Sequence, residues 1–173
     1  MTQRYFHDFA VGQRFETGTY TLDSEELFEF AQCYDPQPFH LDAEAAARSV
    51  FRGIAASGWH TAALTIKLLV ESDLAIAGGI VGRVIETLEW PRPVRAGDTL
   101  VVRSEVLDVS ASRSRPGGKI RMRSETINQE DEVVQAMTAL LLVPSRYRLS
   151  AARLPTLPGA SSPCARAAPA PQG

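Results

Sequence analysis

The sequence predicts a single α+β domain in which helices come first and a sheet of antiparallel strands follows. Apolar residues between positions 24 and 70 recur with helical spacing, whereas from Gly82 onward they alternate as in half-buried strands. Short turn sequences separate the expected strands, and strands joined by short connections are most simply antiparallel. With 173 residues, 45% of them hydrophobic and 22% charged, the chain can bury one sizeable core.

The first elements are a strand and two helices. The strand is expected over 14–22, which is rich in Thr, Phe and Tyr. A helix should follow, because Asp23 can cap its start and Glu26 lies three residues on, as in a capping box. Its core-facing side should consist of Leu27, Phe30, Ala31 and Tyr34, and Pro36 should end it. A second, alanine-rich helix is expected over 43–48, with Asp42 as its cap.

The segment 58–70 should be the central helix of the domain. It contains one formal charge, Lys67, and apolar residues fall on nearly every helical face. A helix of that kind is buried, and this one is too short to span a bilayer. Strands are then expected over 83–90, 99–109, 119–129 and 133–143, and the last, with its unbroken apolar run, should be central in the sheet.

Composition divides the chain and excludes several classes of function. Residues 1–146 form the expected domain, whereas 147–173, rich in Pro and Ala, should be a flexible tail. A net charge of −2 gives no indication of binding to nucleic acid or an anionic membrane. No apolar run reaches the about 18–20 residues of a membrane span, and the N-terminus lacks a secretory signal, so a cytoplasmic protein is expected.

The most informative stretch joins the first two helices. Asp35 and His40 lie five positions apart, and Pro36 and Pro38 should hold the segment between them stiff and extended. A carboxylate and an imidazole on one rigid loop can act as an acid–base pair. From these two residues alone, a turn-forming aspartate and a surface histidine are the simpler explanation of the pattern.

Three motifs together resemble the MaoC-like dehydratase and (R)-specific enoyl-CoA hydratase family. Its signature is Asp, a variable residue, Asn-Pro, a variable residue and His; Asp35, Pro38 and His40 match it, while Gln37 stands where Asn is usual. The glycine that begins the family's central helix corresponds to Gly58, and the segment 93–100 resembles the family's proline and Gly-Asp segment. The resemblance implies the hot-dog fold, in which a curved antiparallel sheet wraps a long helix. It also implies a homodimer.

The resemblance implies hydration of an enoyl thioester, or the reverse reaction, with syn addition of water and an (R)-3-hydroxyacyl product. Asp35 and His40 would then be catalytic and hold the reacting water. The backbone N–H of Gly58, at a helix N-terminus, would bind the thioester oxygen, although a glycine there also simply suits the turn. Substrate contacts are expected from Gln37, Ser57 and Trp59. No metal or redox cofactor is implied, and coenzyme A enters only as part of the acyl-CoA substrate.

Several alternatives stay open. A hot-dog thioesterase would direct water at the carbonyl, and a non-catalytic acyl-CoA-binding protein would keep the fold without turnover. The basic loop 113–119 can meet coenzyme A phosphates, although an exposed cationic hairpin needs no ligand. His60, two residues past Gly58, is expected to be a buried histidine with local hydrogen-bond partners.

Overall fold

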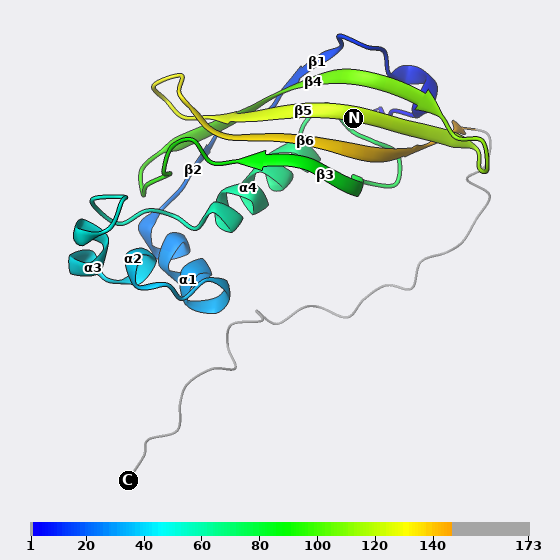
Figure 1. Cartoon of the computed structure of the whole chain (residues 1–173). Coiled ribbons are helices and arrows are strands. Elements are labelled where there is room, and N and C mark those ends of the chain that lie inside the picture. The colour runs from blue at the N-terminus through cyan, green and yellow to red at the C-terminus, as the bar shows by residue number, and fades with distance from the viewer. Residues whose placement is uncertain (1, 147–173) are drawn as a thin grey trace, which may run out of the picture.

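We describe residues 2–146 of the protein from a computed structural model (Figure 1). The expected tail, 147–173, lies outside the described residues. The helices are the 3-10 turn η1 (Phe6–Asp8), α1 (Ser24–Tyr34), α2 (Pro38–Leu41), α3 (Ala43–Arg48) and α4 (Gly58–Glu71). The strands are β1 (Arg14–Glu16), β2 (Tyr20–Thr21), β3 (Val81–Glu89), β4 (Thr99–Ala111), β5 (Gly117–Ile127) and β6 (Val133–Pro144).

The strands form one antiparallel sheet in the order β1-β4-β5-β6-β3, and the short β2 pairs with the start of β4. The antiparallel arrangement is as predicted. The prediction that the last strand is central is wrong by one position, because β5 lies in the middle and β6 lies between β5 and β3. On β5, Arg121 and Arg123 face solvent while Ile120 and Met122 are buried, so one face of the sheet meets water.

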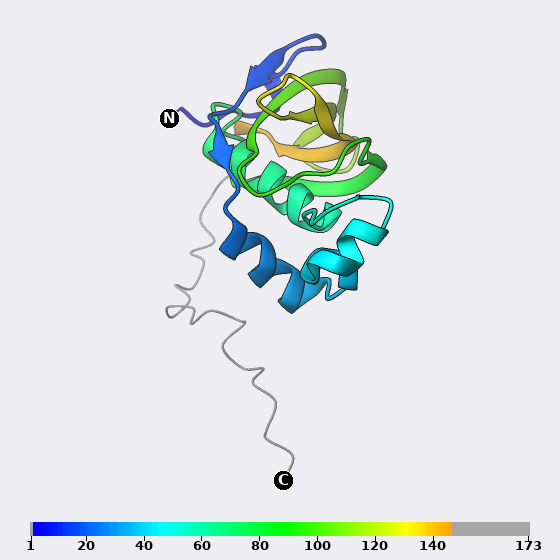
Figure 2. The same ribbon diagram turned by 90° about the vertical axis from the view of Figure 1, so that its left-hand side faces the viewer.

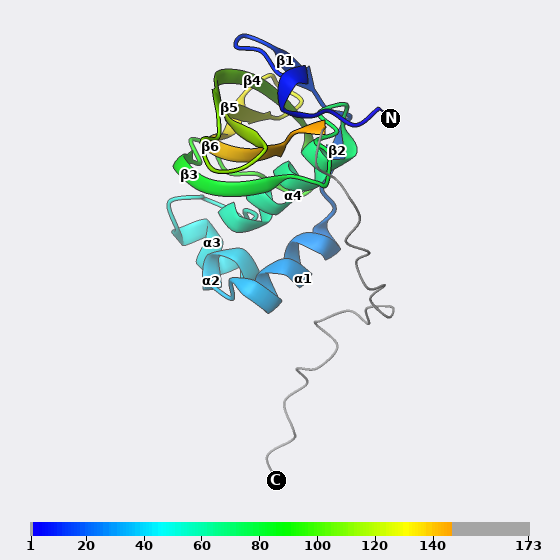
Figure 3. The same cartoon turned by 90° about the vertical axis from the view of Figure 1, so that its right-hand side faces the viewer.

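Helix α4 lies against the concave face of the sheet, which curves around it (Figures 2 and 3). Leu64 and Leu68 of α4 belong to the same hydrophobic cluster as Val102, Val106 and Met122 of the sheet. Helices α1, α2 and α3 lie on the other side of α4 from the sheet, near its N-terminal end. This is the predicted hot-dog fold. In the described part of the chain, no helix is long and apolar enough to cross a membrane.

The expected strand over 14–22 is divided in two by a contact with a distant strand. Between β1 and β2, the backbone N–H of Thr17 donates to the Val102 carbonyl, and its hydroxyl accepts a hydrogen bond from the Val102 N–H, both at 3.0 Å. The hydroxyl therefore takes the place of a ladder carbonyl. The residues around Thr17 in the sequence do not predict this contact, because its partner Val102 is distant along the chain.

The first helix begins as predicted, but two of its side chains are placed differently. Asp23 accepts a hydrogen bond from the Glu26 N–H at 2.9 Å. The Glu26 carboxylate does not complete the capping box; it accepts from the Tyr20 hydroxyl instead. Tyr34, expected in the core, is exposed, because the chain turns away at Pro36 and leaves the last turn uncovered.

Helix α4 is buried on only part of its circumference. Leu64, Thr65 and Leu68 are buried, but Ile66 and Val70 are exposed. The prediction of burial on every face is therefore wrong. In a single chain, the face of α4 that carries Ile66 and Val70 is exposed to solvent.

Candidate active site

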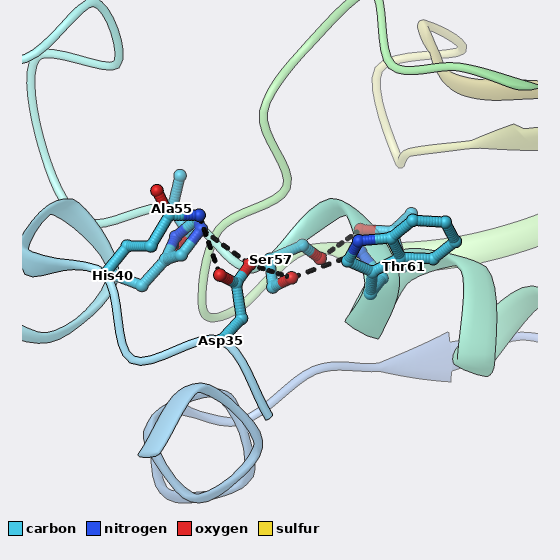
Figure 4. A network of polar contacts seen from close by, with 7 residues as sticks. Asp35, His40, Ala55, Ser57 and Thr61 are labelled. Carbon is cyan, nitrogen blue, oxygen red and sulfur yellow. Dashed lines mark hydrogen bonds and ion pairs between the residues drawn. The ribbon is translucent and has the colours of Figure 1, made fainter. Parts of the chain in front are cut away.

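Asp35 and His40 are brought together by the end of one helix and the start of another. Asp35 is the C-cap of α1, and its N–H donates to the Ala31 carbonyl at 3.0 Å. Gln37 is extended, as predicted, but Pro38 begins the short helix α2, so the expected extended path to His40 is wrong. Proline suits the first position of a helix, where its missing N–H costs no hydrogen bond. The helical turn carries His40 back toward Asp35, with Nε2 3.4 Å from Oδ2 (Figure 4).

The two nitrogens of the His40 imidazole have different neighbours, a backbone carbonyl and the Asp35 carboxylate. Nδ1 lies 2.8 Å from the carbonyl oxygen of Ala55. A carbonyl oxygen only accepts hydrogen bonds, so Nδ1 carries a proton in both the neutral and the charged ring. Proton exchange is left to Nε2, which faces Asp35. The ring is 3% exposed, which holds its orientation.

The carboxylate of Asp35 is held by two donors. Ser57 Oγ donates to Oδ2 at 2.6 Å, and Gln37 Nε2 donates to Oδ1 at 2.7 Å. Burial acts to raise the pKa of Asp35, but these two hydrogen bonds and the neighbouring His40 outweigh it and lower the pKa below its usual value. Asp35 is therefore ionised at neutral pH. Gln37, which departs from the family signature, steadies the carboxylate.

Ser57 joins the aspartate to the start of α4. It is the N-cap of this helix, and its Oγ accepts a hydrogen bond from the Trp59 N–H at 3.2 Å. The same hydroxyl donates to Asp35, so both of its hydrogen-bonding directions are used within the protein. Ser57 is 1% exposed and, unlike the other five candidates, is not among the residues that line the cavity described below; its hydroxyl contacts Asp35 instead.

Gly58 opens α4 directly under the indole of Trp90. A Cβ at position 58 would lie 2.8 Å from the Trp90 ring, so only glycine fits without moving the indole. Within residues 2–146, no protein acceptor is hydrogen-bonded to the Gly58 N–H. This donor lies at the positive end of the α4 dipole, where negative charge is favoured.

The catalytic candidates line a cavity of about 550 Å³. Its wall includes Asp35, Gln37, His40, Gly58 and Trp59, five of the six residues singled out in the sequence, together with Phe39, Val50, Phe51, Ala56, Thr61 and 90–94. The cavity thus combines apolar walls with a few polar side chains, among them Asp35, His40 and Arg92, a combination that is typical of a small-molecule site.

Trp90 is a cavity-lining residue that the sequence did not indicate, and it contacts two of the residues that the sequence did indicate. It covers Gly58 and packs edge-to-face on Trp59, with ring centroids 5.5 Å apart. Its Nε1 donates to Gln135 Oε1 at 2.8 Å, and the fully buried Gln135 donates in turn to Thr65 at 2.9 Å. A signal was present, since a tryptophan at a strand end beside a proline-rich loop is suited to a cavity wall.

Two other sequence candidates lie outside this cavity. His60 is buried, stacks on Phe30 at 4.4 Å, and has Nε2 3.5 Å from Glu26. Burial lowers the pKa of His60. The sequence predicts a buried histidine with local hydrogen-bond partners, but Nδ1 has no hydrogen-bond partner among the described residues. The basic hairpin 113–119 lies at the opposite end of the sheet from α1–α3. The described residues contain no group of three or more His, Cys, Asp or Glu side chains suited to a metal ion.

Comparison with known families agrees with this geometry. The family described as the MaoC like domain matches residues 8–129, which is most of the chain. The protein belongs to the MaoC-like dehydratase family. As a MaoC-like protein it falls among hydratases and dehydratases, which makes it a hydro-lyase at the level of the family.

Individual relatives agree with this assignment. The MaoC-like dehydratase from Rhodospirillum rubrum is 48% identical, with a TM-score of 0.79 over 83% of this chain and 98% of that one. The R-hydratase PhaJ1 from Pseudomonas aeruginosa is 29% identical, with a TM-score of 0.65 over 90% of this chain and 96% of that one. A 3-hydroxybutyryl-CoA dehydratase from Methylorubrum extorquens is 33% identical over 143 residues, covering 82% of this chain and 85% of the relative.

Proposed function

We propose that the protein adds water to a trans-2-enoyl-CoA to give the (R)-3-hydroxyacyl-CoA, or catalyses the reverse dehydration. The observation that carries the proposal is the Asp35–His40 pair. Its imidazole is held by Ala55 so that only Nε2 can exchange protons, and its carboxylate is held ionised 3.4 Å from that nitrogen. Both groups line an otherwise largely apolar cavity that begins at a free helix N–H.

In the proposed mechanism one water lies between the two side chains. His40 Nε2 accepts a proton from the water as its oxygen bonds to Cβ of the substrate, and the π electrons move onto the thioester oxygen. Asp35 accepts a hydrogen bond from the water and stabilises the imidazolium, but its lowered pKa makes it the weaker base. The imidazolium then gives the proton to Cα. Because hydroxyl and proton come from the same side, the addition is syn.

The Gly58 N–H is the proposed donor to the developing enolate oxygen. It is directed from the first turn of α4, a helix of 14 residues whose dipole favours an anion at this end. Removing one donor of this kind from an enzyme usually costs about 3–4 kcal/mol of transition-state stabilisation. Trp59 and Trp90 form the apolar wall beside this donor, and Gln37 lines the cavity, so we propose that all three meet the substrate.

The proposal is tested by following loss of enoyl-thioester absorbance with crotonyl-CoA and with longer and branched enoyl-CoAs. His40→Gln and Asp35→Asn should each lower kcat by about 10²–10⁴-fold, the usual contribution of general acid–base catalysis. His7→Gln changes an exposed histidine outside the cavity and should leave the rate unchanged. Release of free thiol in place of hydration would identify a thioesterase, and binding of acyl-CoA without turnover would identify a non-catalytic binding protein.

We also propose that the active form is a homodimer joined along β3. This strand lies at the edge of the sheet, and Val81, Val84 and Ile85 on it are exposed. An open edge with apolar side chains is a surface that soluble proteins normally cover. Antiparallel pairing of β3 with β3 of a second copy would complete the sheet across a two-fold axis.

The distribution of charge along β3 favours pairing with β3 of a second copy. Arg83 lies in its first half, and Glu86 and Glu89 lie in its second half, Glu86 being paired with Arg121 of β5 in the same chain. Antiparallel self-pairing places the cationic half of one strand beside the acidic half of the other. Ile85→Lys should therefore give a monomer by light scattering after size-exclusion chromatography, whereas Val50→Lys, at an apolar position 90% exposed on a loop, should remain dimeric.

A further inference from the structure

A second concave site lies at the far end of the sheet from the catalytic pair and is strongly cationic. It is a cavity of about 440 Å³ lined by Arg83 of β3, Arg113, Arg115 and Lys119 of the β4–β5 hairpin, and small neighbours Ala111, Ser112 and Ser114. We call the four cations the basic cluster. Of the residues that the structure describes, no acidic one lines this cavity.

The four charges of the basic cluster lie close together and are not paired with a carboxylate among residues 2–146. Among the described residues, none of the four makes an ion pair, whereas Arg14, Arg103, Arg121 and Arg123 on the same sheet each pair with a carboxylate. Residues 147–173 contain no Asp or Glu. Like charges gathered without counter-charges repel one another, and this arrangement suits an anionic ligand.

The hairpin is held in this place by its backbone. At Gly117, φ is +109°, and a Cβ would lie 2.3 Å from the Val143 carbonyl oxygen. A Cβ at Gly118 would lie 2.2 Å from the Phe6 ring. Gly117 lets the hairpin pack closely on the end of β6, and Gly118 lets it pack closely on Phe6 of η1. Arg115 and Pro116 line one hollow with Val81 at the start of β3.

In one chain the basic cluster is far from Asp35 and His40. It lies beside the start of β3, whereas Trp90 of the catalytic cavity follows its end, and nine residues of strand span about 26–30 Å. Antiparallel pairing of β3 with a second copy reverses this relation. It places the start of one β3 beside the end of the other, and therefore the basic cluster of one protomer beside the catalytic cavity of its partner.

We infer that the basic cluster binds the phosphates of coenzyme A whose acyl group occupies the partner protomer's catalytic cavity. This inference rests on the proposed function and on the proposed dimer, and it favours coenzyme A as the carrier. Glu89 of the second copy would lie near Arg83, which leaves Arg113, Arg115 and Lys119 for the phosphates. Their multiple cationic donors match a ligand with several phosphate oxygens.

The first test compares substrates with and without these phosphates. Arg113→Ser/Arg115→Ser should raise KM for crotonyl-CoA about ten-fold with little change in kcat, and should leave KM for crotonyl-N-acetylcysteamine unchanged. The control Arg14→Ser/Arg48→Ser removes the same charge elsewhere and should change neither. KM of the wild type should rise with salt more steeply than KM of the cluster variant. Equal changes with both substrates, or none with either, would overturn the inference.

The second test asks which protomer supplies the cluster. A heterodimer of one His40→Gln chain and one Arg113→Ser/Arg115→Ser chain, purified through two different tags, has a single intact catalytic pair. If the cluster acts across the dimer, that site should show the wild-type KM for crotonyl-CoA. A raised KM would show that it acts within its own chain and would overturn the assignment.

Failure of the proposed function can be separated from failure of this inference. If the wild type does not hydrate enoyl-CoA, calorimetry with adenosine 3′,5′-bisphosphate still tests the cluster directly. Binding that is lost in Arg113→Ser/Arg115→Ser supports an anion site for this nucleotide, and no binding to the wild type refutes it. Hydration of a carrier-protein thioester in strong preference to crotonyl-CoA would replace coenzyme A with an acidic protein as the ligand.

Discussion

Ser57 offers the sharpest single perturbation, because one hydroxyl both caps α4 and holds Asp35. Ser57→Ala removes the 2.6 Å hydrogen bond to Asp35 Oδ2 and the 3.2 Å bond from the Trp59 N–H. A hydrogen bond to a charged group contributes about 1.5–3 kcal/mol, which corresponds to a loss in kcat of about 10–100-fold if the geometry of Asp35 depends on it. The lost cap should lower the free energy of unfolding by about 1 kcal/mol.

The pH dependence gives the same substitution a distinct signature. The pKa of Asp35 is lowered in the folded protein, so its ionised form adds stability above the ordinary pKa of an aspartate and loses that contribution as pH falls through the lowered value. Removing the Ser57 donor should raise this pKa. The acid limb of the pH–rate profile, and the onset of acid destabilisation, should both move to higher pH.

Ser72→Ala is the matched control. Ser72 lies at the other end of α4, is buried, donates to the Leu69 carbonyl at 2.8 Å and accepts from the Leu74 N–H at 3.2 Å. It should cost similar stability in thermal unfolding, with kcat and the acid limb unchanged. If Ser57→Ala and Ser72→Ala alter the pH–rate profile alike, or if neither alters it, the role of Ser57 as the support of Asp35 is refuted.

Three further predictions follow from contacts around the site. Gly58→Ala should lower activity, and should lower the free energy of unfolding by about 1–3 kcal/mol because its Cβ meets the Trp90 ring. The same substitution should cost less in a Trp90→Leu chain, measured against the Trp90→Leu single variant, and an equal cost in both chains would reject the clash. Gln37→Asn should keep more activity than Gln37→Ala, because asparagine retains a side-chain amide that can donate a hydrogen bond to Asp35 and alanine does not. Equal rates in the two variants would contradict the support of Asp35 by Gln37. The hydrogen bond to Glu26 raises the pKa of Tyr20 to about 12, so its stabilising contribution should be present below about pH 10 and lost as pH rises through 12. Ultraviolet titration should show one tyrosine that ionises at a higher pH than the others, and Glu26→Gln should lower the pH at which it ionises. An unchanged titration in Glu26→Gln would contradict the contact.

Local signals predicted the elements that local interactions form. The cap at Asp23, the cap at Asp42 and the alternation of β5 all follow from neighbours a few residues away, and all three are present. The short helix α2 was missed because two prolines suggest extended chain equally well. Pro38 instead occupies the first turn of a helix, where proline is also favoured.

Long-range contacts explain what the sequence could not supply at the site. The family signature located Asp35, His40 and Gly58, but nothing in the spacing shows that the Ser57 hydroxyl points at Asp35. Trp90 reaches the site only because the end of β3 passes over the start of α4. Burial of α4 was overestimated because an apolar residue pattern does not distinguish a helix face packed on the core from one that is exposed, as Ile66 and Val70 are.

Hydration of crotonyl-CoA in D2O, read by proton NMR of the product, tests the central claim most directly. Proton transfer through His40 on the same side as the attacking water predicts one deuterium at Cα, syn to the new hydroxyl, in an (R)-3-hydroxyacyl thioester. His40→Gln should reduce formation of that product without changing its configuration. Anti addition, an (S) product, or hydration by the His40→Gln variant at the wild-type rate would contradict the proposed mechanism.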